Sequence, residues 1–371
     1  MRRLIITFLF LSTISVLAQY SSSDNIFYTR FEGVIGNNIQ VKANIVRLFD
    51  KLSGNYQYRF INEDTEMYYG KIINLNGDVN DEQADLKEMG QESITFTGIL
   101  RQDSFIGVWN TPDNKQLTFD MKEYYPKGTL PFDIYYLHSE GKLVPDNNNS
   151  PIAEIELTLI FPLDEYFQSG IVDSVKQIIA HSFFGDNFYE KNPDSMLTNF
   201  ETEYFTNYKE QNEDWHSKGA SFSWQKNVNM SVAFNSNYLV CLEYLKYAYS
   251  GGAHGMSNIA YDIINLNNGT LLAYKDIFQE DTEDSLTSIL THKLRKDYKI
   301  PDDIPLKKAG FFVDEIVPNH NIYINGNGIG FVYNSYEIAP YSSGQTNIFL
   351  EFDNVVGLLK KDTPVAMIAT R

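Results

Sequence analysis

Cysteine is almost absent from this chain of 371 residues, which contains a single one, Cys241. One thiol excludes an internal disulfide bond, so no covalent cross-link helps to hold the fold. Cys241 stands in the apolar stretch Tyr238-Leu-Val-Cys-Leu-Glu-Tyr244. A cysteine in such surroundings behaves as a small hydrophobic residue. We therefore expect a buried core thiol and not a nucleophile.

Basic residues are also scarce. Lys and Arg together number 30 against 48 Asp and Glu, which gives a formal net charge of −18 at pH 7. A surface of this kind repels nucleic acid and anionic lipid and attracts cationic partners, with a strong dependence on salt. The charge balance thus excludes nucleic-acid binding as a main function, but it favours no particular reaction.

Long apolar runs are lacking beyond the first one. Met1-Arg2-Arg3 precedes the apolar stretch from Leu4 to Ala18, a pattern typical of a signal peptide over residues 1–18. Its removal after Ala18 leaves 28 basic and 48 acidic residues, a formal charge of −20. No run approaches the roughly 20 apolar residues that a membrane span needs. We expect an exported protein without a membrane span, in the periplasm or outside the cell.

Catalytic sequence patterns are missing as well. The chain has no Gly-x-Ser-x-Gly motif of the α/β-hydrolase type. Its histidines are scattered, and none forms the short spacing that is typical of zinc enzymes; they stand at positions 138, 181, 216, 254, 292 and 320. The sequence alone therefore predicts no catalytic residue, no metal ligand and no cofactor, although folding can bring distant histidines together.

The N-terminal region, residues 25–143, reads as an all-β domain. An aromatic-x-Gly pattern recurs in Phe31-Glu-Gly33, Phe96-Thr-Gly98 and Phe105-Ile-Gly107. Glycine inside a strand marks a bend or a close approach of backbones, and short strands at even spacing favour closure. We predict a meander that curls into a sandwich or a small barrel.

Residues 144–151 contain Pro145-Asp-Asn-Asn-Asn-Ser-Pro151, which predicts a linker. Residues 152–365 then alternate between strand and helix patterns, and we predict an α+β domain with an antiparallel sheet and helices on one side. The expected helices are 170–184, one from residue 193, and 284–298. The expected strands are 152–161, 219–234, 238–249, 258–266, 270–274 and 347–352, with a hairpin at 321–331.

The most distinctive loop surrounds His254 with Gly251, Gly252 and Gly255. Glycine permits positive φ angles and close backbone approach, and an imidazole there can donate a hydrogen bond, accept one or bind a metal. The alternative is a tight structural corner in which His254 only hydrogen-bonds the turn. Downstream, Asn268-Gly269 predicts a β-hairpin.

A second motif runs from Phe331 to Gly344. Tyr336, Glu337 and Tyr341 offer aromatic and polar groups that can stack on a sugar or grip a protein loop. The alternative is that Pro340 and Gly344 merely end a strand. If the two loops meet, Glu337 can pair with His254, and we state this as a hypothesis that requires the side chains to lie within about 6 Å.

The order of these two motifs, Gly-Gly-Ala-His-Gly and then the closing motif, resembles domain-of-unknown-function family 3298, usually paired with family 4163. This family includes the extracellular domain of RsiV-like anti-sigma factors and the accessory region of PdaC-type peptidoglycan deacetylases. The resemblance covers the C-terminal part of the chain. It implies an extracellular recognition role, with lysozyme or a peptidoglycan fragment as a possible partner. The metal motifs of the deacetylase catalytic domain are absent, so that activity does not carry over.

Three hypotheses follow. The first is a non-enzymatic recognition protein of the bacterial envelope that binds a peptidoglycan-related ligand or a cationic protein such as lysozyme. In the second, an envelope glycan hydrolase uses His254 as base and Glu337 as orienting acid. The third is a scaffold that docks a partner through strand edges. Oligomeric state does not follow from the sequence.

Overall fold

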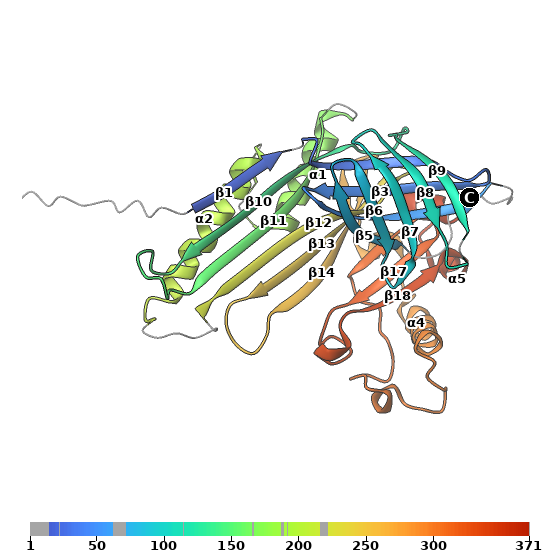
Figure 1. Ribbon diagram of the computed structural model, residues 1–371. Coiled ribbons are helices and arrows are strands. Elements are labelled where there is room, and N and C mark those ends of the chain that lie inside the picture. The colour runs from blue at the N-terminus through green and yellow to red at the C-terminus, as the bar shows by residue number, and fades with distance from the viewer. Residues whose placement is uncertain are drawn as a thin grey trace, which may run out of the picture.

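The computed structural model describes residues 15–21, 23–61, 72–113, 115–164, 167–186, 189–190, 192–215 and 222–370. Three β layers dominate these residues: a closed barrel, a seven-stranded sheet and a three-stranded sheet. Figure 1 shows the barrel seated beside one end of the long sheet, with helices behind the sheet. Within the described residues, no helix combines the length and the apolar character needed to cross a membrane. The predicted combination of an all-β part and an α+β part is confirmed.

The barrel is an antiparallel meander in which each strand pairs with the next and the last pairs with the first. This arrangement confirms the predicted closure and selects the barrel over the sandwich. Its strands are β2 (Ile26–Ile35), β3 (Ile39–Leu48), β4 (Lys51–Phe60), β5 (Ile73–Asn80), β6 (Gln83–Glu88), β7 (Gln91–Leu100), β8 (Ser104–Asn110) and β9 (Gln116–Glu123).

Aromatic side chains fill the barrel. Phe96 and Phe105 both pack edge-on against Phe119, with ring centroids 5.3 and 4.7 Å apart. The aromatic-x-Gly pattern follows from this packing, because residues two apart in a strand share a face. A Cβ atom at Gly98 would lie 2.7 Å from the Cα atom of Gly107. The two glycines therefore let neighbouring strands approach where the barrel curves.

The seven-stranded sheet has the order β1-β10-β11-β12-β13-β14-β15. Its strands are β1 (Ser15–Ser21), β10 (Phe132–Lys142), β11 (Ile152–Pro162), β12 (Trp224–Ser236), β13 (Leu239–Tyr249), β14 (Met256–Asn265) and β15 (Thr270–Leu271). All neighbours are antiparallel except β11 and β12, which are parallel. The prediction of an antiparallel sheet is therefore confirmed for the other pairs and wrong for β11 and β12.

Two helices lie between β11 and β12 in sequence and cover one face of the sheet (Figure 1). They are α1 (Ser169–Phe184), close to its predicted bounds, and α2 (Pro193–Gln211), which begins at the predicted residue. A parallel pair needs such a crossover, because a short turn cannot bring the chain back to the starting edge. Gly185 ends α1 with a φ of 95°, which only glycine adopts readily.

The opposite face of β13 packs on the smaller sheet, in the order β16-β17-β18. Val240 and Leu242 belong to the core under α1 and α2, whereas Leu239 and Cys241 belong to the core shared with the smaller sheet. Cys241 is buried, which confirms its prediction as a core residue, and this burial raises the pKa of its thiol. The elements of this layer are α3 (Tyr274–Ile277), α4 (Glu283–Tyr298), η2 (Leu306–Ala309), β16 (Ile322–Ile324), β17 (Gly328–Tyr333), η3 (Tyr341–Ser343), β18 (Thr346–Glu351), α5 (Phe352–Val355), η4 (Val356–Leu358) and α6 (Pro364–Ala369).

Buried polar contacts attach the barrel to the long sheet. The guanidinium of Arg30, only 2% exposed, donates from Nε to the carbonyl of Asn235 over 3.0 Å. Asn55 donates to the carbonyl of Val232 over 2.8 Å. Both acceptors lie in β12, so the barrel is fixed to a strand in the middle of the sheet.

The end of the predicted signal peptide and the predicted linker fall at two different places in the long sheet. Residues 1–14 of the predicted signal peptide lie outside the described residues, while Ala18, the predicted cleavage position, lies in β1. β10 pairs with β11 over eleven residues, and the predicted linker 144–151 is the turn between them. The division into domains itself stays a prediction.

Candidate functional site

The loop between β13 and β14 adopts the backbone that its glycines predicted. Gly251 and Gly252 have φ angles of 102° and 96°. The hydroxyl of Tyr249 donates to the carbonyl of Gly252 over 3.1 Å, which closes the corner. Gly255 is required for lack of space and not for its φ angle, because a Cβ atom there would lie 2.4 Å from the hydroxyl oxygen of Tyr247. The next residue after this crowded position, Met256, begins β14.

Side-chain amides attach the second motif to the edge of β14. Asn334 accepts from the backbone N–H of Ile259 over 2.7 Å and donates to its carbonyl over 3.0 Å. Asn321 also donates to the carbonyl of Ile259, over 2.8 Å. The amide group of Asn334 thus replaces the peptide group of a missing neighbouring strand. This contact brings the loop after β17 beside the loop that carries His254.

Three exposed rings stack where the two loops meet. The imidazole of His254 lies on the ring of Tyr341, with centroids 4.1 Å apart and an interplanar angle of 25°. Tyr336 stacks on Tyr341 with centroids 5.8 Å apart. Tyr336 is 50% exposed and Tyr341 37% exposed. We call these three residues the aromatic cluster, and it unites three of the four ligand-binding residues predicted from the sequence.

Hydrogen bonds fix two of the rings. His254 Nδ1 lies 2.9 Å from the carbonyl oxygen of Gly255, and the hydroxyl of Tyr341 donates to the same oxygen over 3.1 Å. Because a carbonyl oxygen only accepts, Nδ1 carries a proton. In the neutral imidazole this leaves Nε2 as an acceptor. The cluster therefore offers a flat aromatic surface with one acceptor nitrogen.

The turn before Tyr341 also has unusual backbone. Tyr336 has a φ of 72°, a left-handed conformation that is uncommon for an aromatic residue. Two backbone hydrogen bonds hold it there, from Tyr336 to Ala339 and from Glu337 to Asn334. Pro340 then precedes η3, and Gly344, with a φ of 67°, ends it. Both residues thus shape the loop that presents Tyr341.

Glu337 is not part of the cluster's hydrogen bonding. Its carboxylate accepts from Asn319 Nδ2 over 3.1 Å. Within the described part of the chain, His254 and Glu337 form no hydrogen bond or ion pair with each other. The pairing of His254 with Glu337 stays a hypothesis, because the hydrogen bonds of these residues go to other partners.

A cavity of about 270 Å³ opens near the same glycine loop, between α2 and the adjoining ends of β12 and β13. Its walls include Phe200, Trp224 and Tyr249. Lys226 also lines it, with Nζ 4.4 Å from the centroid of the Phe200 ring. Burial and then the positive charge of Lys246 lower the pKa of Lys226. Sequence reasoning missed this cavity, because its walls come from three separate elements.

Comparison with known sequences finds two matches, which meet at the aromatic cluster. Residues 156–257, including His254, match the family described as deacetylase PdaC. Residues 275–353, including Tyr336 and Tyr341, match a family of proteins of unknown function, DUF3298. The sequence interpretation placed both motifs in the DUF3298 family. That interpretation also included the accessory region of PdaC, and the match of the His254 loop to the PdaC family supports this part of it.

One curated relative is the peptidoglycan-N-acetylmuramic acid deacetylase PdaC of Bacillus subtilis strain 168. It is 23% identical over 177 residues, which are 47% of this chain and 38% of that protein. The chain therefore matches well under half of the length of this relative.

Two solved structures are similar. A DUF3298 family member from Bacteroides fragilis NCTC 9343 has a TM-score of 0.62 at 23% identity, over 67% of this chain and 100% of that chain. A DUF3298 family protein from Pseudomonas aeruginosa PAO1 has a TM-score of 0.44 at 20% identity, over 62% of this chain and 95% of that chain. The first of these establishes a shared fold.

Proposed function

We propose that this protein is an exported, non-enzymatic recognition protein of the bacterial envelope that binds a peptidoglycan-related glycan through the aromatic cluster. The observation that carries the proposal is the stack of His254, Tyr341 and Tyr336, three exposed rings at the junction of the two matched segments. The name of the Bacillus subtilis relative supports peptidoglycan as the substrate class.

Exposed aromatic rings suit a glycan because the C–H faces of a sugar ring are apolar and flat. Nε2 of His254 supplies an acceptor for a sugar hydroxyl beside the stacked rings. The nearby cavity adds one cation, Lys226, which can pair with a carboxylate of the ligand. A glycan that carries carboxylates therefore suits both the aromatic cluster and Lys226, whereas a neutral polymer suits only the aromatic cluster.

The test is cosedimentation of the full chain with purified insoluble peptidoglycan. Loss of a stacking ring removes about 0.5–1.5 kcal/mol beyond the buried area, so Tyr341→Ala and Tyr336→Ala should each weaken binding by about twofold to twelvefold. Tyr298→Ala is the matched control, because Tyr298 is 50% exposed like Tyr336 but lies at the end of α4. Equal binding by all variants would contradict the proposal. Release of soluble muropeptides that stops in His254→Ala would support the hydrolase instead.

A second candidate is binding of a cationic protein such as lysozyme, which the net charge of −18 favours. Calorimetric titration with lysozyme at about 0.15 M and about 0.5 M salt separates a shaped interface from general attraction, since the screening length falls from about 8 Å to about half of that. Defined stoichiometry that survives high salt would favour this candidate. Binding that disappears with salt would leave only charge attraction.

A further inference from the structure

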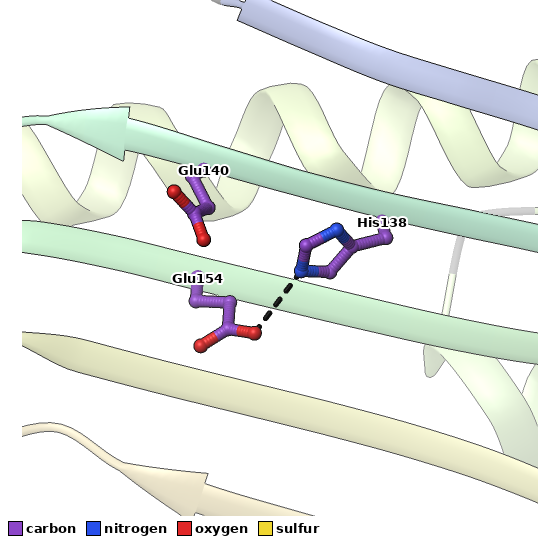
Figure 2. A group of neighbouring side chains, drawn as sticks. All are labelled: His138, Glu140 and Glu154. Carbon is purple, nitrogen blue, oxygen red and sulfur yellow. Dashed lines mark hydrogen bonds and ion pairs between the residues drawn. The ribbon is translucent and has the colours of Figure 1, made fainter.

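A histidine and two glutamates converge on the long sheet, far from the aromatic cluster in sequence. His138 and Glu140 are two residues apart in β10 and so share one face of the sheet. Glu154 in β11 lies directly opposite Glu140 in the strand register. Figure 2 shows the three side chains on the same side of the two strands, with a helix behind them. The neighbouring residues Ala153 and Ile155 point the other way, into the core under the helices.

The distances suit a common ligand. His138 Nε2 lies 3.0 Å from a carboxylate oxygen of Glu154. One ligand atom from each of the three residues lies within 4.8 Å of the others. Two ligands of one zinc ion can be at most about 4 Å apart, because each bond is about 2.0–2.2 Å long. A small rotation of a glutamate side chain would bring the ligand atoms from 4.8 Å to within this separation.

The charges around this group also favour a cation. Glu140 and Glu154 face each other directly, and like charges in opposite positions are destabilising. Glu156, opposite His138, adds a third carboxylate, which accepts from the hydroxyl of Tyr136. In the described part of the chain, no Lys or Arg forms an ion pair with any of the three carboxylates. Apart from the imidazole of His138, no basic side chain in the described residues therefore pairs with these carboxylates.

The strand beyond offers one more oxygen. Asn227 in β12 lies opposite Glu156. Its Oδ1 is buried and accepts no hydrogen bond from the described residues. The polar residues that lie side by side on β10, β11 and β12 thus supply several oxygen acceptors, and the imidazole of His138 supplies a nitrogen ligand.

We propose that His138, Glu140 and Glu154 bind a divalent zinc ion. Imidazole nitrogen with carboxylate oxygen suits zinc, whereas calcium and magnesium prefer oxygen ligands alone. Three protein ligands leave a position for water or for a group on a ligand. The side chains of His138 and Glu154 are 28% and 38% exposed, so an ion can enter from solvent. Binding at Nε2 would displace the proton that Nε2 shares with Glu154.

The experiment is equilibrium dialysis of the full chain, first stripped with a chelator, against zinc at neutral pH in the presence of excess magnesium. Three variants are compared: His138→Ala, Glu154→Gln and the control His181→Ala. His181 is a matched control because its Nδ1 lies 2.9 Å from a carboxylate oxygen of Asp186, and no third ligand accompanies that pair among the described residues. Circular dichroism checks that every variant is folded.

We expect one zinc per wild-type chain, and the same for His181→Ala. Each of the other two variants should bind at least about tenfold more weakly, which is the range for loss of groups that support a metal site. A cobalt spectrum with visible d–d bands in the wild type, absent in His138→Ala, would support imidazole ligation. Unchanged stoichiometry and affinity in His138→Ala and Glu154→Gln would overturn the proposal, as would an equal loss in His181→Ala.

Discussion

The amide of Asn334 is one of the contacts that hold the two loops of the aromatic cluster together, and we predict that Asn334→Ala loosens this junction. The change removes two hydrogen bonds to Ile259 and leaves its N–H without the acceptor it has here. The carbonyl of Ile259 keeps Asn321 as a donor. At about 1 kcal/mol for each hydrogen bond, the free energy of unfolding should fall by about 2 kcal/mol.

Two measurements check this value. Thermal unfolding should shift down by about 3 °C, given an unfolding entropy of about 2.1 cal/mol/K for each residue. Native-state hydrogen exchange should show faster exchange at the amide of Ile259, because that N–H loses its acceptor. Asn334→Asp is the matched variant, since it keeps an oxygen acceptor for this N–H but loses the donor to the carbonyl. It should lose about half as much stability.

The reasoning would be refuted if Asn334→Ala changed neither the exchange rate at Ile259 nor the unfolding free energy beyond about 0.5 kcal/mol, the usual range for surface substitutions. In that case the loop would be held by other contacts. A loss of stability with normal exchange at Ile259 would also count against it, because the effect would then come from somewhere other than the β14 edge.

Three further predictions concern the core. Gly98→Ala places a Cβ atom 2.2 Å from the carbonyl oxygen of Ile106, so it should destabilise the protein by about 1–3 kcal/mol in urea titrations, whereas Gly170→Ala, with open space around it, should not. Burial raises the pKa of Asp262 above its ordinary value of 3.8. Between the pKa of Asp262 in the unfolded state and its higher pKa in the folded state, only the folded state keeps the proton, so the free energy of unfolding falls as pH rises through this range. Asp262→Asn does not titrate, so measured against wild type its stability should increase with pH. Cys241 should react with a thiol reagent only at the rate of unfolding, and rapid labelling of the folded protein would contradict its burial.

Much of the fold could be predicted from local patterns. β13 was predicted as a central strand because both of its faces are apolar, and the structure buries Val240 on one face and Cys241 on the other. The helix α1 was predicted from the apolar residues along one of its faces and from Gly185, which follows its last residue. The parallel direction of β11 and β12 could not be predicted, because a strand pattern has the same period in either direction.

The candidate site was predictable only in part. Glycine around His254 and the aromatic residues of the second motif indicated loops with unusual backbone, and both have positive φ angles at Gly251 and Tyr336. Nothing in the sequence indicated that Asn334 would imitate a strand. His138 and Glu154 are 16 positions apart, and their approach depends on the strand register that the turn 144–151 sets. Register is a property of the paired strands and not of either one alone.

The barrel is inserted between two strands that are neighbours in the long sheet. β1 pairs with β10, although β2 to β9 lie between them in the chain. Contacts within the barrel mostly join consecutive strands, whereas the pairs β1–β10 and β11–β12 join segments that are distant in the chain. Local pairing closes short loops and forms quickly, while distant pairing is slow. The barrel should therefore form early during folding, and closure of the long sheet around it should be the slow step.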